Sequence, residues 1–414
     1  MQIFSMVKVT ILSLLCSLVS CGQQLNKPIK KEALNSEKKQ MHIVVAANRT
    51  EAYLPLLTKK HIAVVANQTS VIFKTATPES PNQYMHLVDS LLSLNVVVKK
   101  VFAPEHGFRG KADAGEKVSD GIDMKTGLPI ISLYGKNRKP RPDQLSGVDM
   151  VVFDIQDVGV RFYTYIATLQ LVMEACAEAQ IPIIVLDRPN PNGHYVDGPT
   201  MKEQHTSFLG MTEIPLVYGM TIGEYARMIN GEGWLKGKIK ADLKVIRLKN
   251  YNHNKPYSLP IRPSPNLPND MAINLYPSLG LFEGTAINAG RGTAYQFQRY
   301  GASFLDSSAY DFKYTPQPNF GSKYPKESGR SCFGQDLSNH PRIAKVSLKW
   351  LIDAYNNCTN QSKFFNTSGF TKHAGTERLQ KQIEAGVSEA AIKKTWKADL
   401  KKFSSIRKKY LLYP

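Results

Sequence analysis

The sequence predicts an α/β protein with a Rossmann-like N-terminal domain, built on a mainly parallel sheet, and a smaller α/β C-terminal domain. From residue 42 onward, apolar runs of strand length alternate with amphipathic segments of helical spacing. The runs are continuous in Val and Ile, which is typical of parallel strands covered on both faces by helices. The chain has 414 residues and is 42% hydrophobic, so it can bury large cores and is expected to form two domains.

Periodicity alone predicts strands and helices along the first half of the chain. The strand candidates are short apolar runs, and the helix candidates place apolar residues three and four positions apart. Thr221 is expected to cap the last of these helices, because Glu224 follows it at the spacing of a capping box. The predicted strands are residues 42–46, 61–66, 96–102, 128–133, 148–155 and 181–186, and the predicted helices are residues 84–94, 165–179 and 221–231.

A polar passage rich in Lys, Asn and Pro, residues 249–260, indicates a boundary between domains. We therefore assign residues 41–258 to the Rossmann-like catalytic domain and residues 259–414 to a C-terminal domain that completes the cleft. The end of the chain, residues 376–412, is predicted to be helical, with core contacts from Trp396, Phe403 and Ile406.

The N-terminus has the layout of an export signal. Lys8 precedes an apolar stretch, residues 9–19, that is too short to remain as a membrane-spanning helix. Leu18-Val19-Ser20-Cys21 resembles the bacterial lipoprotein box, which implies that residues 1–21 are a signal peptide and that Cys21 is acylated. Residues 22–40 are polar and rich in lysine, which favours a flexible tether over a buried helix. We expect an exported lipoprotein that is anchored in a membrane of the cell envelope, on the periplasmic face.

The chain is strongly basic. It has 53 Lys and Arg against 34 Asp and Glu, a formal net charge of +19, which favours polyanionic surroundings such as nucleic acid, anionic lipid or an acidic wall polymer. The sequence lacks the aromatic-interleaved basic motifs of nucleic-acid modules, so no nucleic-acid partner is expected.

Several common chemistries lack their motifs in this sequence. No GxGxxG follows the first predicted strand, and no P-loop, GxSxG or HExxH occurs, so neither a cofactor nor a metal is expected. Beyond the signal, Cys176, Cys332 and Cys358 show no CxxC spacing, so a structural zinc is not expected and one disulfide remains possible.

Polar side chains gather where the predicted strands end. Since ligands of open α/β sheets bind beyond the carboxyl ends of strands, residues 101–110, 154–165 and 187–193 are expected to meet at one cleft. Residues 281–293 add polar groups spaced by small residues, which permit close approach of a ligand. A helix cap, an ion pair or a packed glycine-rich turn would account equally well for any one of these groups. The candidate site residues are Glu105, His106, Arg109, Asp154, Gln156, Asp157, Arg161, Tyr163, Tyr165, Arg188, Asn190, Glu283, Asn288 and Arg291.

These residue types suit the cleavage of a sugar. Glycoside hydrolysis uses two carboxyl groups flanking the scissile bond, and Glu105 is the first candidate. Asp154, Asp157 and Glu283 are the candidates for the second. Tyrosines offer a flat apolar face and a hydroxyl to a sugar, and arginines grip a substrate carboxylate through two hydrogen bonds. His106 is expected to support the site by hydrogen bonding rather than to bind a metal.

Six motifs occur in order along nearly all of the mature chain: PEHGFRG (104–110), FDIQDVGVRFYTY (153–165), LDRPNPNG (186–193), SPNLP (264–268), FEGT (282–285) and IRKKYLLY (406–413). Together they resemble the bacterial exo-β-N-acetylmuramidase family. The resemblance implies a Rossmann-like domain joined to a smaller domain, with the active site in the cleft between them. It further implies release of N-acetylmuramic acid from the non-reducing end of peptidoglycan fragments, with the glutamate of the PEHG motif, here Glu105, as catalytic residue.

Two other functions use the same residues. A non-catalytic lipoprotein that binds muropeptides would hold its ligand with the same arginines and tyrosines, and a related hexosaminidase would act on N-acetylglucosamine. Peptidoglycan-derived sugars are the expected partners in each case, and the sequence leaves the oligomeric state open.

Overall fold

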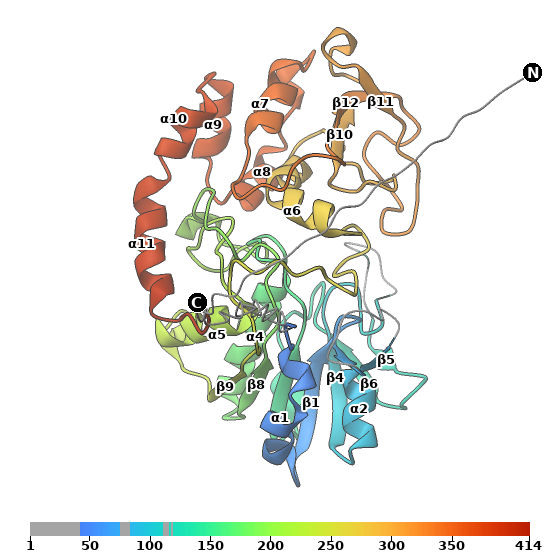
Figure 1. Cartoon of the computed structure of the whole chain (residues 1–414), viewed down its shortest axis with the longest axis vertical. Coiled ribbons are helices and arrows are strands. Elements are labelled where there is room, and N and C mark those ends of the chain that lie inside the picture. The colour runs from blue at the N-terminus through green and yellow to red at the C-terminus, as the bar shows by residue number, and fades with distance from the viewer. Residues whose placement is uncertain (1–41, 75–82, 111–115, 117–118) are drawn as a thin grey trace, which may run out of the picture. The chain divides into compact units, whose positions relative to one another are not determined.

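A seven-stranded sheet forms the first half of the fold in the computed structural model, which describes residues 42–74, 83–110, 116 and 119–414 (Figure 1). The strand order is β5-β6-β4-β1-β7-β8-β9. All neighbours are parallel except β5, which runs antiparallel to β6 at the edge. The strands are β1 (His61–Ala66), β4 (Val97–Ala103), β5 (Gly121–Ile122), β6 (Pro129–Ser132), β7 (Met150–Asp154), β8 (Ile183–Leu186) and β9 (Leu243–Ile246).

The order of the strands creates a switch point in the middle of the sheet. The chain begins at β1, moves outward through β4 and β6, and then returns to β7 on the other side of β1 before continuing to β8 and β9. This is the doubly wound order of Rossmann-like folds, whose ligands bind beyond the carboxyl ends of the strands at the point of reversal. The predicted fold class is therefore confirmed, and the segments after β4, β7 and β8 emerge at one edge.

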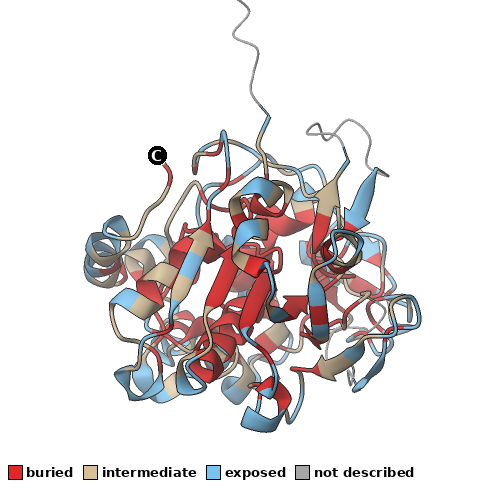
Figure 2. Cartoon of the chain, turned by 90° about the horizontal axis from the view of Figure 1, so that it is seen from below, coloured by how far each residue is buried: buried red, intermediate tan, exposed pale blue. Residues whose placement is uncertain are grey.

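Helices cover both faces of the sheet because its central strands are apolar on both sides. In β1, Ala63 and Val65 pack into one core cluster, while Ile62, Val64 and Ala66 pack into another. The first cluster includes residues of two helices, α4 (Tyr165–Glu178) and α5 (Ile222–Gly231), and the second includes residues of α1 (Thr50–Leu57) and α2 (Leu87–Ser93). Figure 2 shows the buried strands flanked by elements with exposed outer faces.

Helix α5 begins at the predicted cap. The Thr221 hydroxyl accepts a hydrogen bond from the backbone N–H of Glu224 at 3.2 Å, and the Glu224 carboxylate accepts one from the backbone N–H of Thr221 at 2.9 Å. This reciprocal pair satisfies two N–H groups that the helix itself leaves free, so the capping-box prediction is confirmed.

The second half of the fold contains a small antiparallel sheet and several helices. The sheet has the order β10-β12-β11, and the predicted helical C-terminus is confirmed as three helices. Trp396 and Phe403 are buried there, and Ile406 packs against the core as a partly buried residue. These elements are α6 (Asp270–Leu279), β10 (Arg299–Ala302), β11 (Phe312–Tyr314), β12 (Cys332–Asp336), α7 (Lys349–Asn356), α8 (Thr367–Ala374), α9 (Arg378–Glu384), α10 (Glu389–Lys394) and α11 (Lys397–Lys408).

The strand prediction at residues 42–46 was wrong. Val44 forms a single bridge with Lys249, and the chain then enters a short 3-10 helix, Ala46–Asn48. Val45 and Ala46 are nevertheless buried against the sheet, so the apolar run indicated burial and not strand pairing. The short elements that complete the fold are β2 (Val71–Phe73), β3 (Tyr84–His86) and α3 (Pro142–Leu145).

Four further points bear on the sequence-based predictions. Cys176, Cys332 and Cys358 are all free and buried, so the possible disulfide is absent among the described residues. The predicted signal, tether and acylated Cys21 lie outside the described part of the chain. Within that part, the helices are all too short or too polar to span a membrane. Residues 42–414 form one compact unit, and the boundary at residue 258 stays a prediction.

Candidate active site

Glu105 lies in a tight turn directly after β4. The backbone N–H of Gly107 donates to the carbonyl of Pro104 at 3.0 Å, and His106 and Gly107 both have positive φ, 69° and 76°. Glycine adopts this conformation without steric cost, so the turn can reverse the chain within three residues of the strand. As a result the carboxyl group of Glu105 projects from the edge of the sheet where ligands of this fold bind.

Two hydroxyl groups hold the Glu105 carboxyl group in place. The Thr164 hydroxyl, at the start of α4, donates to Oε2 of Glu105 at 2.9 Å. The Tyr134 hydroxyl, which follows β6, hydrogen-bonds the same carboxyl group. Burial and the nearby Glu105 carboxylate both raise the pKa of Tyr134 well above its usual range, so this phenol stays protonated. Glu105 is therefore positioned by the segments after two other strands of the same sheet.

Glu105 and Glu283 line one cavity of about 530 Å³. Its walls come from the segments after β4, β6 and β7 and from α6, α8 and the 3-10 helix Gly280–Gly284. Residues from before and after residue 258 therefore line the same cavity. The lining residues are Glu105, His106, Tyr134, Arg138, Phe162, Tyr163, Thr164, Ser207, Phe208, Leu209, Ser264, Asn266, Leu267, Tyr276, Glu283, Arg291, Phe297, Lys372 and His373.

Glu283 is held beside two basic side chains. Arg291 Nη1 lies 3.0 Å from its Oε1, and His373 Nε2 lies 3.8 Å from its Oε2. The other ring nitrogen of His373 lies 2.9 Å from the carbonyl of Gly369, an acceptor, so Nδ1 carries a proton. Since Glu283 and Arg291 are each about one-quarter exposed, the pair remains accessible from the cavity.

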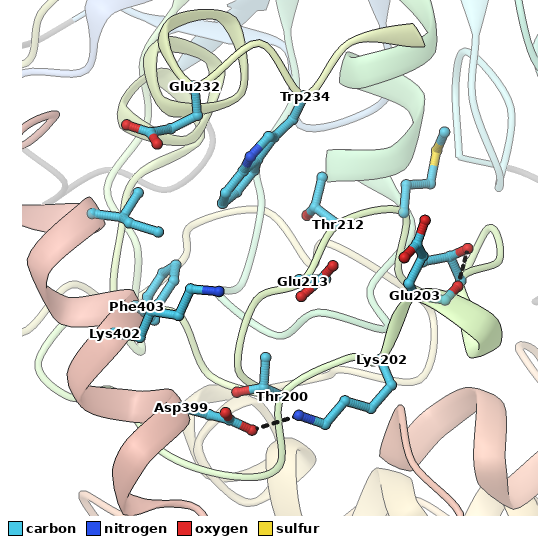
Figure 3. Close-up of a pocket in the computed structure, with 13 residues that line it drawn as sticks. Thr200, Lys202, Glu203, Thr212, Glu213, Glu232, Trp234, Asp399, Lys402 and Phe403 are labelled. Carbon is cyan, nitrogen blue, oxygen red and sulfur yellow. Dashed lines mark hydrogen bonds and ion pairs between the residues drawn. The ribbon is translucent and has the colours of Figure 1, made fainter.

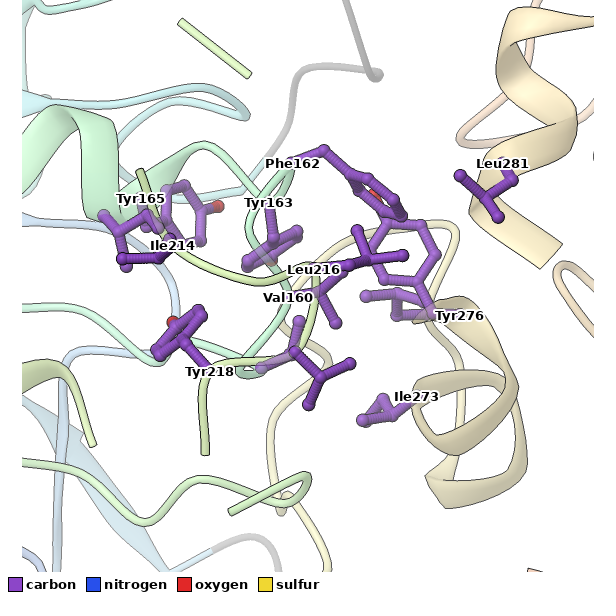
Figure 4. Close-up of a cluster of buried hydrophobic side chains, with 14 of the residues drawn as sticks. Val160, Phe162, Tyr163, Tyr165, Ile214, Leu216, Tyr218, Ile273, Tyr276 and Leu281 are labelled. Carbon is purple, nitrogen blue, oxygen red and sulfur yellow. The ribbon is translucent and has the colours of Figure 1, made fainter. Parts of the chain in front are cut away.

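Aromatic rings form an apolar wall of the cavity. Tyr276 on α6 makes edge-to-face contacts with Phe162 and Phe297, with ring centroids 5.1 and 4.7 Å apart. Tyr163 packs near the same ring, and its hydroxyl donates to the carbonyl of Pro263 at 2.7 Å. Figure 4 shows how the segment around Phe162 and Tyr163 meets Tyr276 of α6. Such rings suit the apolar face of a sugar. Tyr165, another predicted substrate contact, is buried behind them, with its ring centroid 4.8 Å from that of Tyr163.

Asp154 and Arg188 pair with each other below the strand ends. Two guanidinium nitrogens of Arg188 donate to the two carboxylate oxygens of Asp154 at 2.6 and 2.8 Å, and a further hydrogen bond reaches the carbonyl of Val71 at 3.1 Å. Asp154 is completely buried and Arg188 is 3% exposed. Because each charge is neutralised by the other, we assign this ion pair a structural role: it holds β7, β8 and β2 together.

Arg161 is also buried, and both of its terminal guanidinium nitrogens bind backbone carbonyls. Its guanidinium donates to the carbonyls of Pro199, Ile214 and His373 at 2.7, 2.9 and 2.8 Å. The last of these bonds reaches the helix that carries the cavity residue His373. Arg161 was predicted to bind substrate, and its position instead favours a role in joining the two halves of the chain.

Asp157 lies in a buried hydrogen-bond network. Its carboxylate accepts from the Tyr218 hydroxyl and from the backbone N–H of Gly159, the latter at 2.7 Å. Burial raises the pKa of Asp157 to about 6. Gln156 beside it donates to the carbonyls of Asp157 and Pro189, both at 2.7 Å.

Three further predicted residues, Arg109, Asn190 and Asn288, bind other segments of the chain. Arg109 pairs with Asp89 and Asp123 at 3.1 and 2.7 Å. Asn190 donates to the carbonyl of Met220 at 2.8 Å. Asn288 donates to the carbonyls of Arg291 and Lys326 at 3.0 and 2.8 Å, which shapes the loop that presents Arg291.

Sequence reasoning missed several cavity residues. Thr164 and Phe162 lie within the polar segment after β7, and Tyr134 lies two residues after the end of β6, so the rule that selected Glu105 could have selected them. Tyr276 and His373 lie on helices without a local signal, because only the packing of α6 and α8 brings them to the cavity.

A second cavity, of about 600 Å³, contains none of the predicted site residues. It lies against α11 and includes Trp234 and the ion pair of Lys202 with Asp399, 2.7 Å apart (Figure 3). The carboxyl ends of β4 and β7 contribute no lining residue there, so the cavity with Glu105 is the candidate active site.

Known proteins share this fold and much of this sequence. Residues 62–271 match the family described as Exo-beta-N-acetylmuramidase NamZ, N-terminal, and residues 274–413 match its C-terminal counterpart. The peptidoglycan beta-N-acetylmuramidase NamZ of Bacillus subtilis (strain 168) is 39% identical over 337 residues, covering 77% of this chain and 80% of that protein.

Two crystal structures of DUF1343 family proteins from Bacteroides fragilis NCTC 9343 are also similar. One is 44% identical with a TM-score of 0.80, covering 90% of this chain and 99% of its own. The other is 26% identical with a TM-score of 0.75, covering 90% of this chain and 100% of its own. Together with the two family matches, which span most of residues 62–413, these similarities show that the chain belongs to the exo-beta-N-acetylmuramidase family and is a glycosidase.

Proposed function

We propose that this protein is an exo-acting glycoside hydrolase that releases N-acetylmuramic acid from the non-reducing end of peptidoglycan fragments, with Glu105 as the catalytic carboxyl group. The observation that carries the proposal is the shared cavity of Glu105 and Glu283. Of the four carboxylates considered from the sequence, these two line it, whereas Asp154 and Asp157 are buried in other networks. The name of the Bacillus subtilis relative supports the substrate class.

The surroundings of the two carboxyl groups suit different roles. Glu105 is oriented by the Thr164 and Tyr134 hydroxyls, and we assign it as the proton donor to the leaving oxygen of the glycosidic bond. Glu283 pairs with Arg291 at 3.0 Å, and we assign its carboxylate as the second catalytic group of the reaction. There it would stabilise the positive charge that develops on the sugar ring or activate the attacking group.

The basic residues of the cavity suit the acid group that distinguishes N-acetylmuramic acid. This sugar carries a lactyl carboxylate, which N-acetylglucosamine lacks. Arg138 and Lys372 line the cavity, and both are exposed. The Arg138 guanidinium stacks 4.5 Å from the ring centroid of Phe208, and among the described residues no ion pair neutralises it. We propose that Arg138 binds the lactyl carboxylate through its planar fork of donors.

The location of the enzyme is part of the same proposal. The apolar segment 9–19 followed by Ser20-Cys21 supports acylation of Cys21 and a membrane anchor in the cell envelope, where wall fragments occur. The net charge of +19 would also favour an acidic wall polymer as surroundings.

The substrate assignment is tested with two matched disaccharides, one with N-acetylmuramic acid and one with N-acetylglucosamine at the non-reducing end. We expect release of free N-acetylmuramic acid from the first and at least about tenfold slower cleavage of the second, because loss of one charged hydrogen-bonded contact costs roughly 1.5–3 kcal/mol. Arg138→Met should reduce the ratio of the two cleavage rates. Arg141→Met, at an exposed arginine paired with Asp143, should leave this ratio unchanged. Binding of the first disaccharide without release would contradict hydrolysis, and a preference for the second would identify a glucosaminidase.

A further inference from the structure

Two aromatic rings are exposed on one loop of the C-terminal half. Tyr324 is 95% exposed and Phe320 is 63% exposed, and both belong to residues 319–326. Isolated exposed apolar residues are common on protein surfaces. Here, however, two large rings lie four residues apart on a loop that the structure holds firmly.

The loop is fixed by its backbone. Asn319 and Ser322 exchange two backbone hydrogen bonds of 3.0 Å, and the Asn319 side chain donates to the carbonyl of Thr293 at 3.1 Å. Gly321 has φ of +94°, and a Cβ atom there would lie 2.8 Å from Cβ of Pro265. Because backbone closure and close packing both define this turn, the backbone that carries Phe320 is preorganised.

The same loop is bonded to the wall of the candidate active site. The carbonyl of Gly321 accepts from Nδ2 of Asn266 at 2.7 Å and from Nη2 of Arg291 at 3.3 Å. Asn266 and Arg291 both line the cavity that contains Glu105. The aromatic loop therefore lies against the wall of that cavity.

A smaller cavity lies beside the candidate active site. It has a volume of about 190 Å³ and is lined by Tyr324 and Ser322 of the loop. It shares Glu283 and Arg291 with the larger cavity. The Glu283–Arg291 pair thus stands between the cavity of Glu105 and the surface that carries Tyr324.

We propose that this side cavity and the rings of Phe320 and Tyr324 bind the sugars on the far side of the cleaved bond, that is, the remainder of the glycan chain. This inference rests on the proposed function. An exo-acting enzyme takes one terminal sugar into its cavity, and the rest of the chain must leave across the rim. The C–H face of a pyranose packs on an aromatic ring, while its hydroxyls stay in water, which an exposed ring on a fixed loop permits.

The test compares two substrates that share the terminal sugar, an aryl glycoside of N-acetylmuramic acid and a glycan chain that ends in N-acetylmuramic acid. For Tyr324→Ala and Phe320→Ala we expect the ratio of KM on the chain to KM on the aryl glycoside to rise roughly 3- to 10-fold, the range of a single aromatic contact. Tyr324→Phe should retain most of the wild-type ratio. Tyr84→Ala, which removes a 39% exposed ring on β3, is the matched control and should not change the ratio.

Equal changes on both substrates, or no change on the chain, would overturn the inference. Failure of the proposed function gives a different result, since the wild type would then cleave neither substrate. In that event, calorimetric binding of the uncleaved chain still decides the inference, which requires weaker binding by Tyr324→Ala than by Tyr84→Ala.

Discussion

The hydroxyl of Thr164 donates a 2.9 Å hydrogen bond to the carboxylate of Glu105, which joins the residue before helix α4 to the turn after strand β4. Strands β4 and β7 lie on either side of the central strand β1 and run parallel to it, so the segments that follow them emerge at the same edge of the sheet. A carboxyl group that must transfer a proton benefits from such fixation, since its orientation is set before substrate arrives.

Replacing Thr164 with Val should lower kcat by up to about tenfold with a smaller effect on KM, because a hydrogen bond of roughly 0.5–1.5 kcal/mol that orients the protonated carboxyl group of Glu105 is lost. Thr164→Ser keeps the hydroxyl and should retain most of the activity. Steady-state kinetics of the three proteins measures this. If the valine variant matched the wild type in kcat, the orienting role of Thr164 would be refuted.

The buried pair of Asp154 and Arg188 should matter for stability and not for chemistry. Asp154→Asn leaves the guanidinium buried without its counter-charge, so we expect a loss of about 3–5 kcal/mol in the free energy of unfolding. The fraction that remains folded should keep kcat within a few-fold of the wild type. Urea unfolding and active-fraction kinetics test both parts. A stable Asp154→Asn protein without activity would instead make Asp154 the second catalytic carboxyl group.

Titration of Asp157 should lower the free energy of unfolding as the pH rises through the weakly acidic range. Burial raises its pKa in the folded state to about 6, above the usual value of about 3.9, so the unfolded chain binds fewer protons between these values. The free energy of unfolding contributed by this group is therefore greatest at low pH. This contribution, on the order of 2–3 kcal/mol, is lost as the pH rises from about 3.9 through about 6.

Asp157→Asn should flatten this pH dependence, because the amide stays neutral and its oxygen can still accept from Tyr218 and Gly159. Chemical unfolding of both proteins at pH 4.5 and 7.5 gives the comparison. Parallel pH profiles for the two proteins would show that Asp157 does not titrate in this way.

The sequence predicted the sheet well because parallel strands are continuous apolar runs. The runs that became β1, β4, β6, β7 and β8 were each identified, and the polar segments after them included Glu105. The strand prediction at residues 42–46 was wrong because this apolar run is buried against a face of the sheet and pairs only at Val44. The strand β9, Leu243–Ile246, was missed because two of its residues are only partly buried and a third is an exposed lysine.

Within the site, local sequence could not separate catalytic groups from structural ones. Asp154 and Glu105 both follow buried strands, yet Asp154 meets Arg188 in the core, whereas Glu105 faces a cavity. Arg161 and Arg291 look alike in sequence, and only the fold shows that backbone carbonyls surround the first. His373 comes from a helix far along the chain, so its approach to Glu283 depends on tertiary packing.

The most direct test of the account is the rate of N-acetylmuramic acid release by Glu105→Gln, measured beside Glu178→Gln. Glu178 is a 51% exposed residue at the end of α4, so its change controls for the loss of one negative charge. We predict that Glu105→Gln lowers kcat at least about a hundredfold while still binding the disaccharide, since a positioned proton donor contributes roughly 10²–10⁴-fold. Glu178→Gln should match the wild type. A Glu105→Gln enzyme within a few-fold of wild-type kcat would contradict the account.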